Sequence, residues 1–282
     1  MSRKYDRCMT INAALQCWAT AALFAPKGDN RNGCVGGEGD AMHGAVFGEF
    51  LGTTVLLLFG NGVVANCVLD RSKGKDGGWM VIATAWGFAV FCGIVTSLAV
   101  GGVAHLNPAV TLASAIVSGD YTHVMPYIAA QLAGALVSAV LVWLAYLPHW
   151  AGSDPDSKLA VFCTQPAIRA PAANFTSEVI GTVVLVVVGM GLASRGFAAA
   201  GLAPGMGPFF WGILVWAIGL SLGGQTGYAI NPARDLGPRI AHAILPIPGK
   251  RDSDWGYAWV PVVAPMVGAA LGAAIVLATG IA

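Results

Sequence analysis

Charged side chains are scarce in this sequence, where they make up 10% of the 282 residues and leave a formal net charge of +1 at pH 7. A soluble domain carries roughly 25% charged residues, so the composition argues against one. The near-neutral balance offers no basic surface, and we expect no nucleic-acid partner. Hydrophobic residues make up 56% of the chain, and its 38 glycines suit close helix packing in lipid. The composition therefore predicts an integral membrane protein.

Residues that bind metals or carry out catalysis are also few. The six cysteines show no metal-ligand spacing, so we interpret them as buried or loop thiols. No arrangement of Ser and His or of zinc ligands coincides with the motifs described below. We therefore expect no metal, no cofactor and no enzymatic activity.

Two short stretches share one tripeptide, and they are Asn107-Pro108-Ala109 and Asn231-Pro232-Ala233. Asn is a favoured N-cap, because its side-chain oxygen accepts a backbone N–H of the first turn. Pro fits the first helical position, where its missing N–H has no intrahelical partner. The apolar runs that follow end at Ser118 and Leu245, about half the roughly 20 residues that a membrane span needs. The sequence thus predicts two half-helices.

Six further segments are long and apolar enough to span a bilayer. We expect them near residues 44–68, 79–101, 124–147, 174–195, 206–224 and 257–280. The halves repeat, because Gly48-Glu49-Phe50-Leu51-Gly52-Thr53 matches Ser177-Glu178-Val179-Ile180-Gly181-Thr182. Three spans per half is an odd number, so the second half enters the membrane from the opposite face. The predicted fold is an all-α membrane protein with six transmembrane helices and two re-entrant half-helices in an inverted 3+3 repeat.

Residues 1–43 differ from the rest and are expected to form an N-terminal tail. Three cations, Arg3, Lys4 and Arg7, precede a short apolar run and a Gly-rich polar stretch. Three interpretations stay open: a disordered or surface-lying tail, an upstream extension outside the natural product, or a cleaved signal peptide.

Two Asn-Pro-Ala motifs in register within a six-span inverted repeat, with Arg234 after the second, resemble the aquaporin or major intrinsic protein family. The resemblance covers residues 44–282 as one aquaporin-like channel domain, with repeats near 44–147 and 174–282. It implies one pore per subunit, a homotetramer, a multi-pass location in the cell membrane and an intracellular N-terminus. The loop cations favour the opposite orientation under the positive-inside rule, so absolute topology stays open.

The stretch from Thr226 to Arg239 is similar to glycerol uptake facilitators, with Asp235 after the arginine and Pro261-Val262 in the last span. The family's narrowest ring maps onto Trp86, Gly219, Tyr228 and Arg234. Water channels carry a histidine at the position of Gly219, so we expect a wider ring here. Tyr228 departs from the Phe that glycerol channels often carry, and its phenol adds polarity at the constriction.

A filter for glycerol needs an apolar wedge and an opposing polar rail. Trp86 and the ring of Tyr228 suit the wedge, and Arg234 supplies donors that keep their charge. The backbone carbonyls expected to line the pore belong to Val103, Ala104, His105, Gly227, Tyr228, Ala229 and Ile230. Arg234 and the positive ends of both half-helices would exclude cations and protons.

Several polar residues have structural interpretations. Glu49 and Glu178 lie within apolar spans, where an unpaired carboxylate is costly, and we expect them to accept hydrogen bonds from the re-entrant loops. Asp235 should orient Arg234 or the loop around it. We expect His105 to be a satisfied interior histidine with only its carbonyl in the pore, and Trp79 and Trp255 to be interfacial anchors.

The sequence therefore predicts a passive channel for glycerol and other small neutral solutes, with water. The alternative within this class is a broader facilitator of water, lactic acid, dihydroxyacetone, hydrogen peroxide or urea. A coupled secondary transporter, which also uses inverted repeats, is the competing class. The expected partners are these solutes, water, the lipid bilayer and further copies of the chain.

Overall fold

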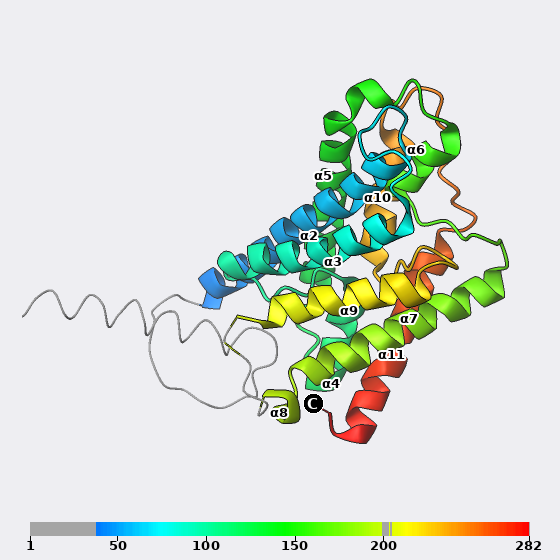
Figure 1. Cartoon of the computed structure of the whole chain (residues 1–282). Coiled ribbons are helices and arrows are strands. Elements are labelled where there is room, and N and C mark those ends of the chain that lie inside the picture. Colours follow the sequence, from blue (N-terminus) through cyan, green and yellow to red (C-terminus); the bar gives the residue numbers. More distant parts are fainter. Residues whose placement is uncertain (1–37, 199–202, 204, 282) are drawn as a thin grey trace, which may run out of the picture.

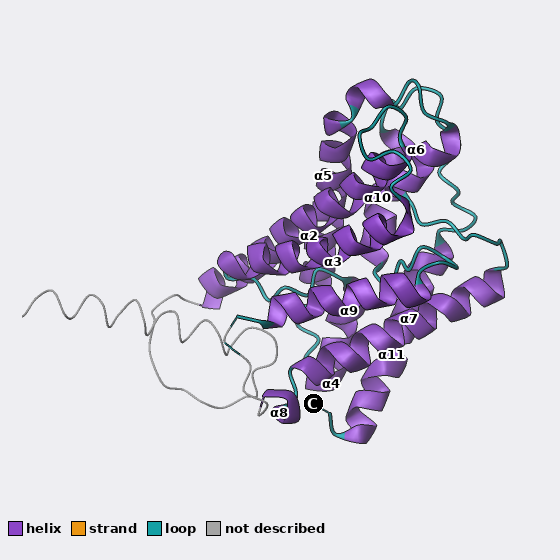
Figure 2. Cartoon of the chain, in the orientation of Figure 1, coloured by secondary structure: helices purple, strands orange, loops and turns teal. Residues whose placement is uncertain are grey.

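The computed structural model describes residues 38–198, 203 and 205–281, and every regular element within them is a helix (Figures 1 and 2). The elements are α2 (Glu38–Val68), α3 (Gly78–Ala99), α4 (Pro108–Ser118), α5 (Val124–Ala145), the 3₁₀ helix η1 (Leu147–His149), α6 (Pro155–Phe162), α7 (Pro171–Leu192), α8 (Arg195–Ala198), α9 (Gly207–Leu222), α10 (Pro232–Ile244) and α11 (Trp259–Thr279). The all-α prediction is confirmed for these residues. Most of the expected N-terminal tail, residues 1–37, lies outside them.

Five of the described helices are long and apolar enough to cross a bilayer: residues Gly44–Val68 of α2, and α3, α5, α7 and α11. The remaining expected span, near 206–224, corresponds to the apolar helix α9, which comprises 16 residues. At 1.5 Å per residue it is about 24 Å long, shorter than the ~30 Å hydrocarbon core of a bilayer. Six full-length spans therefore stay a prediction.

Two helix starts differ from the expected boundaries. The first span was expected from residue 44, but α2 already begins at Glu38. The fourth was expected from residue 174, whereas α7 begins at Pro171. Pro171 occupies the first turn, and the Asn174 side chain accepts the Ala170 N–H and donates to the Ile168 carbonyl. This local network favours the earlier start, because it satisfies backbone groups that a helix end leaves unpaired.

The two repeats pack in the same way and exchange their half-helices. In the first repeat α2 packs against α3 and α5, and in the second α7 packs against α9 and α11. Half-helix α4 of the first repeat lies against α11 of the second, and α10 of the second lies against α5 of the first (Figure 1). Each half-helix is thus held mainly by the opposite repeat, as an inverted repeat requires.

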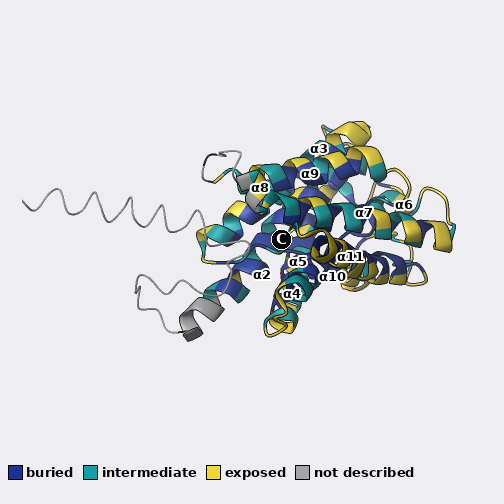
Figure 3. Ribbon diagram, turned by 90° about the horizontal axis from the view of Figure 1, so that it is seen from below, coloured by how far each residue is buried: buried dark blue, intermediate teal, exposed yellow. Residues whose placement is uncertain are grey.

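The outer surface of the helix bundle is apolar. Exposed residues lie along the outward faces of the long helices (Figure 3), and among them are Phe59, Phe88, Leu144, Ile180 and Leu271. A soluble protein rarely exposes so much contiguous apolar surface. Buried polar residues, in contrast, lie between the helices, where they include Glu49, Gln131 and Glu178. This arrangement is that of a multi-pass membrane protein.

Helix α10 ends under an ammonium group. The Lys250 Nζ donates to the carbonyls of His242, Ala243 and Leu245 at 2.5, 2.8 and 2.8 Å. These carbonyls belong to the last turn, where a helix has unpaired acceptors and the negative end of its dipole. The lysine therefore stabilises the C-terminal end of this half-helix.

Close contact between α3 and α9 depends on two glycines. A Cβ built at Gly87 would lie 2.8 Å from the Gly212 carbonyl oxygen, and one at Gly212 would lie 2.7 Å from the Gly87 carbonyl oxygen. Backbone atoms cannot rotate away as a side chain can, so any larger residue separates the helices. These helices carry Trp86 and Gly219, so their spacing sets the width of the region between them.

We expect Gly212→Ala to lower the melting temperature, because its methyl group meets the backbone of α3. Gly62→Ala is the matched control, since a Cβ at this helical position meets no heavy atom within 4 Å. The control should keep or raise stability, because Ala favours a helix over Gly by about 1 kcal/mol. Thermal unfolding in detergent, followed by tryptophan fluorescence, measures both. Equal melting temperatures for the two variants would contradict the packing argument.

Candidate functional site

Each half-helix is capped by the asparagine of its motif. Asn107 is extended, with φ −159° and ψ 119°, and its Oδ1 accepts the Ala109 N–H at 2.8 Å. Asn231 is also extended, and its Oδ1 accepts the N–H groups of Ala233 and Arg234 at 3.0 and 3.3 Å. Pro108 and Pro232 occupy the first turns. The structure thus has the caps that the sequence predicts.

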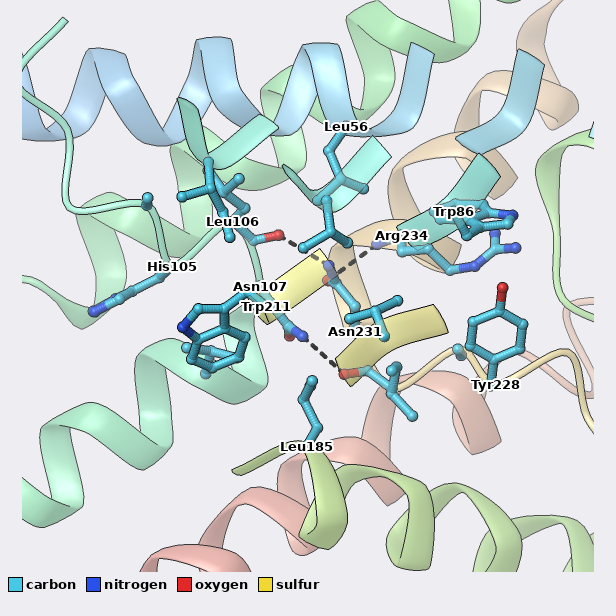
Figure 4. Close-up of a pocket in the computed structure, with 17 residues that line it drawn as sticks. Leu56, Trp86, His105, Leu106, Asn107, Leu185, Trp211, Tyr228, Asn231 and Arg234 are labelled. Atoms are coloured by element: carbon cyan, nitrogen blue, oxygen red, sulfur yellow. Dashed lines mark hydrogen bonds between the residues drawn. The ribbon is translucent and has the colours of Figure 1, made fainter. Parts of the chain in front are cut away.

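The two caps bind to each other's loops. The Asn107 Nδ2 donates to the Ile230 carbonyl at 2.8 Å, and the Asn231 Nδ2 donates to the Leu106 carbonyl at 2.9 Å (Figure 4). These reciprocal bonds bring the N-termini of α4 and α10 together at the centre of the molecule. Each amide has two N–H groups, so one donor per asparagine is left over after this contact.

The chain before each cap has an irregular backbone. Positive φ angles occur at Ala104 (60°) and Leu106 (53°) in the first loop, and at Tyr228 (37°) and Ile230 (41°) in the second. Residues other than glycine rarely adopt this conformation, which costs of order 1–3 kcal/mol each. Four such residues in two matching loops need a compensating interaction.

Two buried carboxylates supply that compensation. The Glu49 oxygens accept the N–H groups of His105 and Leu106 at 2.7 and 2.6 Å. The Glu178 oxygens accept those of Ala229 and Ile230, both at 2.9 Å. These are the bonds expected from the sequence.

Gln131 completes the network around Glu49, and the sequence did not predict this role. Its Nε2 donates both to Glu49, at 2.7 Å, and to the Thr111 hydroxyl, at 2.9 Å. A polar residue in the middle of an apolar span was the available signal.

One cavity connects the two caps. It is lined by Asn107, Asn231 and Arg234 together with the apolar or aromatic side chains of Leu56, Trp86, Val90, Ile94, Val110, Leu185, Trp211, Val215 and Tyr228. The loop residues Ala104, His105, Leu106, Ala229 and Ile230 also line it. Val103, Gly219 and Gly227, which the sequence placed at the pore, are not among the lining residues.

One of the carbonyls expected to line the pore also joins the two repeats. The Ile230 carbonyl accepts the Asn107 amide, and its place facing a solute stays a prediction. The matching acceptor in the first loop is Leu106, which the prediction left out. Sequence spacing alone does not reveal this pairing, because it depends on how the two halves meet.

Arg234 lies on an aromatic face within this cavity. Its guanidinium carbon is 4.4 Å from the centroid of the Trp86 ring, a cation–π geometry. The Arg234 Nη1 has no hydrogen-bond partner among the described residues. Arg234 therefore has an unused donor at the site, while Trp86 limits where the guanidinium can move.

Two tryptophans that line the cavity, Trp86 and Trp211, each pack against a glycine. A Cβ at Gly60 would lie 2.4 Å from the Trp86 ring, and one at Gly189 would lie 2.2 Å from the Trp211 ring. Gly60 and Gly189 occupy equivalent positions in the repeat. Trp211 was missed in the sequence analysis, although this correspondence between the glycines was the signal that pointed to it.

Asp235 and its partner Arg239 connect half-helix α10 to the loops that surround it. The Asp235 carboxylate accepts the Thr164 N–H and hydroxyl at 2.8 and 2.6 Å, and pairs with Arg239 at 2.7 Å. Arg239 also donates to the carbonyls of Ser253 and Asp254 at 2.6 and 3.0 Å. Both charged side chains are fully buried. Asp235 thus orients the surrounding loops, which is one of its two expected roles.

His105 differs from its expected state. His105 is among the residues that line the cavity, and its ring meets Tyr127 edge-on with 5.7 Å between centroids. The His105 Nδ1 has no hydrogen-bond partner in the described part of the chain. The expectation of a satisfied interior histidine is therefore not met at Nδ1, whereas the expectation that only its carbonyl lies in the pore stays a prediction.

Trp79 also makes a contact that its expected anchor role did not include. The indole Nε1 donates to the Gly219 carbonyl at 2.8 Å, and the ring meets Tyr228 edge-on with 5.8 Å between centroids. Trp79 thus links α3 to α9 next to the cavity-lining Tyr228.

A bundle of apolar helices with two half-helix N-termini meeting at a central cavity defines a membrane protein that moves solutes. The chain belongs to the major intrinsic protein family, because the family model described as "Major intrinsic protein" matches residues 40–276. The probable glycerol uptake facilitator protein of Thermotoga maritima is 56% identical over 229 residues, covering 80% of this chain and 95% of that protein.

Other relatives and a solved structure agree with this membership. The D/L-lactic acid transporter of Lactiplantibacillus plantarum is 41% identical over 231 residues, covering 80% of this chain and 93% of that protein. The X-ray structure of the aquaglyceroporin from Plasmodium falciparum matches with a TM-score of 0.73 at 30% identity, covering 85% of this chain and 98% of that chain.

We expect Glu178→Gln to destabilise the second loop. The amide that replaces one carboxylate oxygen is a donor, so one backbone N–H at Ala229 or Ile230 loses its acceptor. Leaving one buried donor unpaired costs about 1–3 kcal/mol. Asp252→Asn is the control, because the Asp252 side chain is 74% exposed. Denaturant or thermal unfolding in detergent compares them, and an E178Q variant as stable as D252N would refute the loop-support role.

Proposed function

We propose that this protein is a passive channel for glycerol and related small uncharged solutes, with water as a further permeant. The observation that carries the proposal is the central cavity, where Arg234 and both motif asparagines present donors beside aromatic and aliphatic walls. The similarity to glycerol uptake facilitators supports the solute class. We propose no catalytic step.

The cavity wall suits a solute with a carbon backbone and hydroxyl groups. Trp86 and the ring of Tyr228 form the apolar side, against which the carbon chain packs. The spare Arg234 donor and the remaining amide hydrogens of Asn107 and Asn231 bind hydroxyl oxygens. A solute that loses its water shell on entering thus gains replacement hydrogen bonds.

Charge is excluded by the same geometry. The N-terminus of each half-helix carries roughly half a positive charge, and the two ends meet at the centre. Arg234 adds a full positive charge that it cannot lose at physiological pH. These positive charges repel a cation that enters the cavity, and the apolar walls do not replace its water shell. The asparagine amides donate to a central water, which orients it and interrupts a chain of proton transfer.

The proposal includes the arrangement around the pore. The chain would place six spans and the two re-entrant half-helices in the cell membrane, with α9 as the shortest span. By membership of the family we also propose one pore per subunit in a homotetramer.

The lactic acid transporter among the relatives favours a second candidate, a broader facilitator of small neutral solutes. Stopped-flow light scattering on proteoliposomes, with water, glycerol, urea and lactic acid in turn, decides between the two. A glycerol channel shows flux proportional to the glycerol gradient, without saturation. An imposed proton gradient should leave that flux unchanged, whereas a coupled transporter responds to it.

We expect Arg234→Val to weaken the exclusion of protons and cations, because it removes the full positive charge from the cavity. Proteoliposomes loaded with a pH-sensitive dye report the proton leak under a potassium diffusion potential. Arg251→Ala is the control, since Arg251 lies in an outer loop with Asp156 and Asp252. An R234V variant with no more leak than R251A would contradict the electrostatic role of Arg234.

A further inference from the structure

The hydroxyl group of Tyr228 is buried at the cavity without a partner. Tyr228 is 6% exposed, and its Oη has no hydrogen-bond partner among the described residues. Figure 4 shows the hydroxyl directed toward the side of the cavity where Arg234 and Trp86 lie. A buried polar group without a partner is unfavourable, so a passing solute supplies the missing hydrogen bond.

Tyr228 and Arg234 offer different chemistry to that solute. The free Arg234 Nη1 can only donate, whereas a phenol hydroxyl can donate or accept. The two groups can therefore form hydrogen bonds to a solute that has an acceptor on one edge and either a donor or an acceptor on another edge. With a purely apolar ring at position 228, the second edge would have no partner there.

The position of the Tyr228 ring is set by α9 and by Trp79. A Cβ at Gly219 would lie 2.8 Å from the Tyr228 Cζ, and one at Gly223 would lie 2.4 Å from its Cδ1. The ring thus fills the space that two glycines leave free. Trp79 closes this space from α3, since its ring meets Tyr228 edge-on and would lie 2.7 Å from the same Gly223 Cβ.

Trp79 is itself fixed by its hydrogen bond to Gly219. The donor is the indole Nε1 and the acceptor is the Gly219 carbonyl, 2.8 Å away. Trp79 is not among the residues that line the cavity. Its ring touches Tyr228, which does line the cavity, and this contact gives Trp79 a route by which it can act on a solute.

We propose that Trp79 is a positioning residue for solute selectivity, which holds the Tyr228 hydroxyl at the cavity so that the constriction is polar on two sides. The constriction then accepts small uncharged solutes with polar atoms on two edges, namely amides such as urea and undissociated hydroxy acids such as lactic acid. This inference rests on the proposed channel function.

The first test is Tyr228→Phe, which removes one oxygen and keeps the ring. In proteoliposomes, the urea-to-glycerol and lactic acid-to-glycerol permeability ratios should each fall about two- to tenfold, as expected for losing one hydrogen bond. Lactic acid is measured at a pH low enough to keep it protonated. Glycerol flux with unchanged ratios would overturn this inference alone, whereas a wild-type protein without glycerol flux would overturn the proposed function.

The second test separates positioning from general support. Trp79→Leu removes the ring edge and the N–H, and should shift both ratios in the same direction as Y228F. In the Y228F background the same substitution should add little, because the two act through one hydroxyl. If W79L does not fold, W79F, which keeps a smaller aromatic ring and lacks the N–H, replaces it.

Trp255→Leu is the matched control, because the Trp255 side chain is 50% exposed in an outer loop. It should leave both ratios unchanged. A W79L variant that lowers all permeabilities equally, or that shifts the ratios as strongly without the Tyr228 hydroxyl, would overturn the positioning role.

Discussion

The reciprocal bonds between Asn107 and Ile230 and between Asn231 and Leu106 hold the centre of this protein together. They join two helix N-termini, each carrying roughly half a positive charge, which repel each other at close range. Each asparagine also satisfies the first turn of its own helix through Oδ1. One side-chain type thus caps a helix, joins the two repeats and keeps a spare donor at the cavity. Alanine or leucine at these positions would lose all three contributions together.

This central contact is possible only because the loops before it are irregular. Positive φ angles at Leu106 and Ile230 bring the acceptor carbonyls within reach of the opposite asparagine. The strain is offset by Glu49 and Glu178, whose oxygens accept the neighbouring N–H groups. A carboxylate inside a membrane span is costly unless several donors surround it, and the loops supply those donors. Strain and buried charge, each unfavourable alone, therefore compensate for each other.

Local chemistry explains what the sequence predicted and what it did not. The half-helices were predictable because capping by Asn and Pro involves only neighbouring residues, and the long helices because length and apolarity suffice. The Leu106 acceptor, the Trp79 contact and the free His105 nitrogen were not predictable, because each depends on how distant helices meet. The spacing of α3 and α9 follows from glycine contacts that no periodicity reveals. The span expected near 206–224 corresponds to the shorter helix Gly207–Leu222, because apolarity alone does not locate the glycine-rich end of a helix.

The two repeats share one arrangement of helices but differ in the side chains that follow their motifs. Val110 and Arg234 occupy matching positions after the two motifs, and both line the cavity. The next residues also match: Thr111 accepts a bond from Gln131 in the first repeat, whereas Asp235 binds Thr164 and Arg239 in the second. The first interaction is neutral, and the second includes a buried ion pair. The full positive charge and the buried ion pair therefore both belong to the second repeat, whereas the first repeat has an apolar side chain and a neutral hydrogen bond at the matching positions.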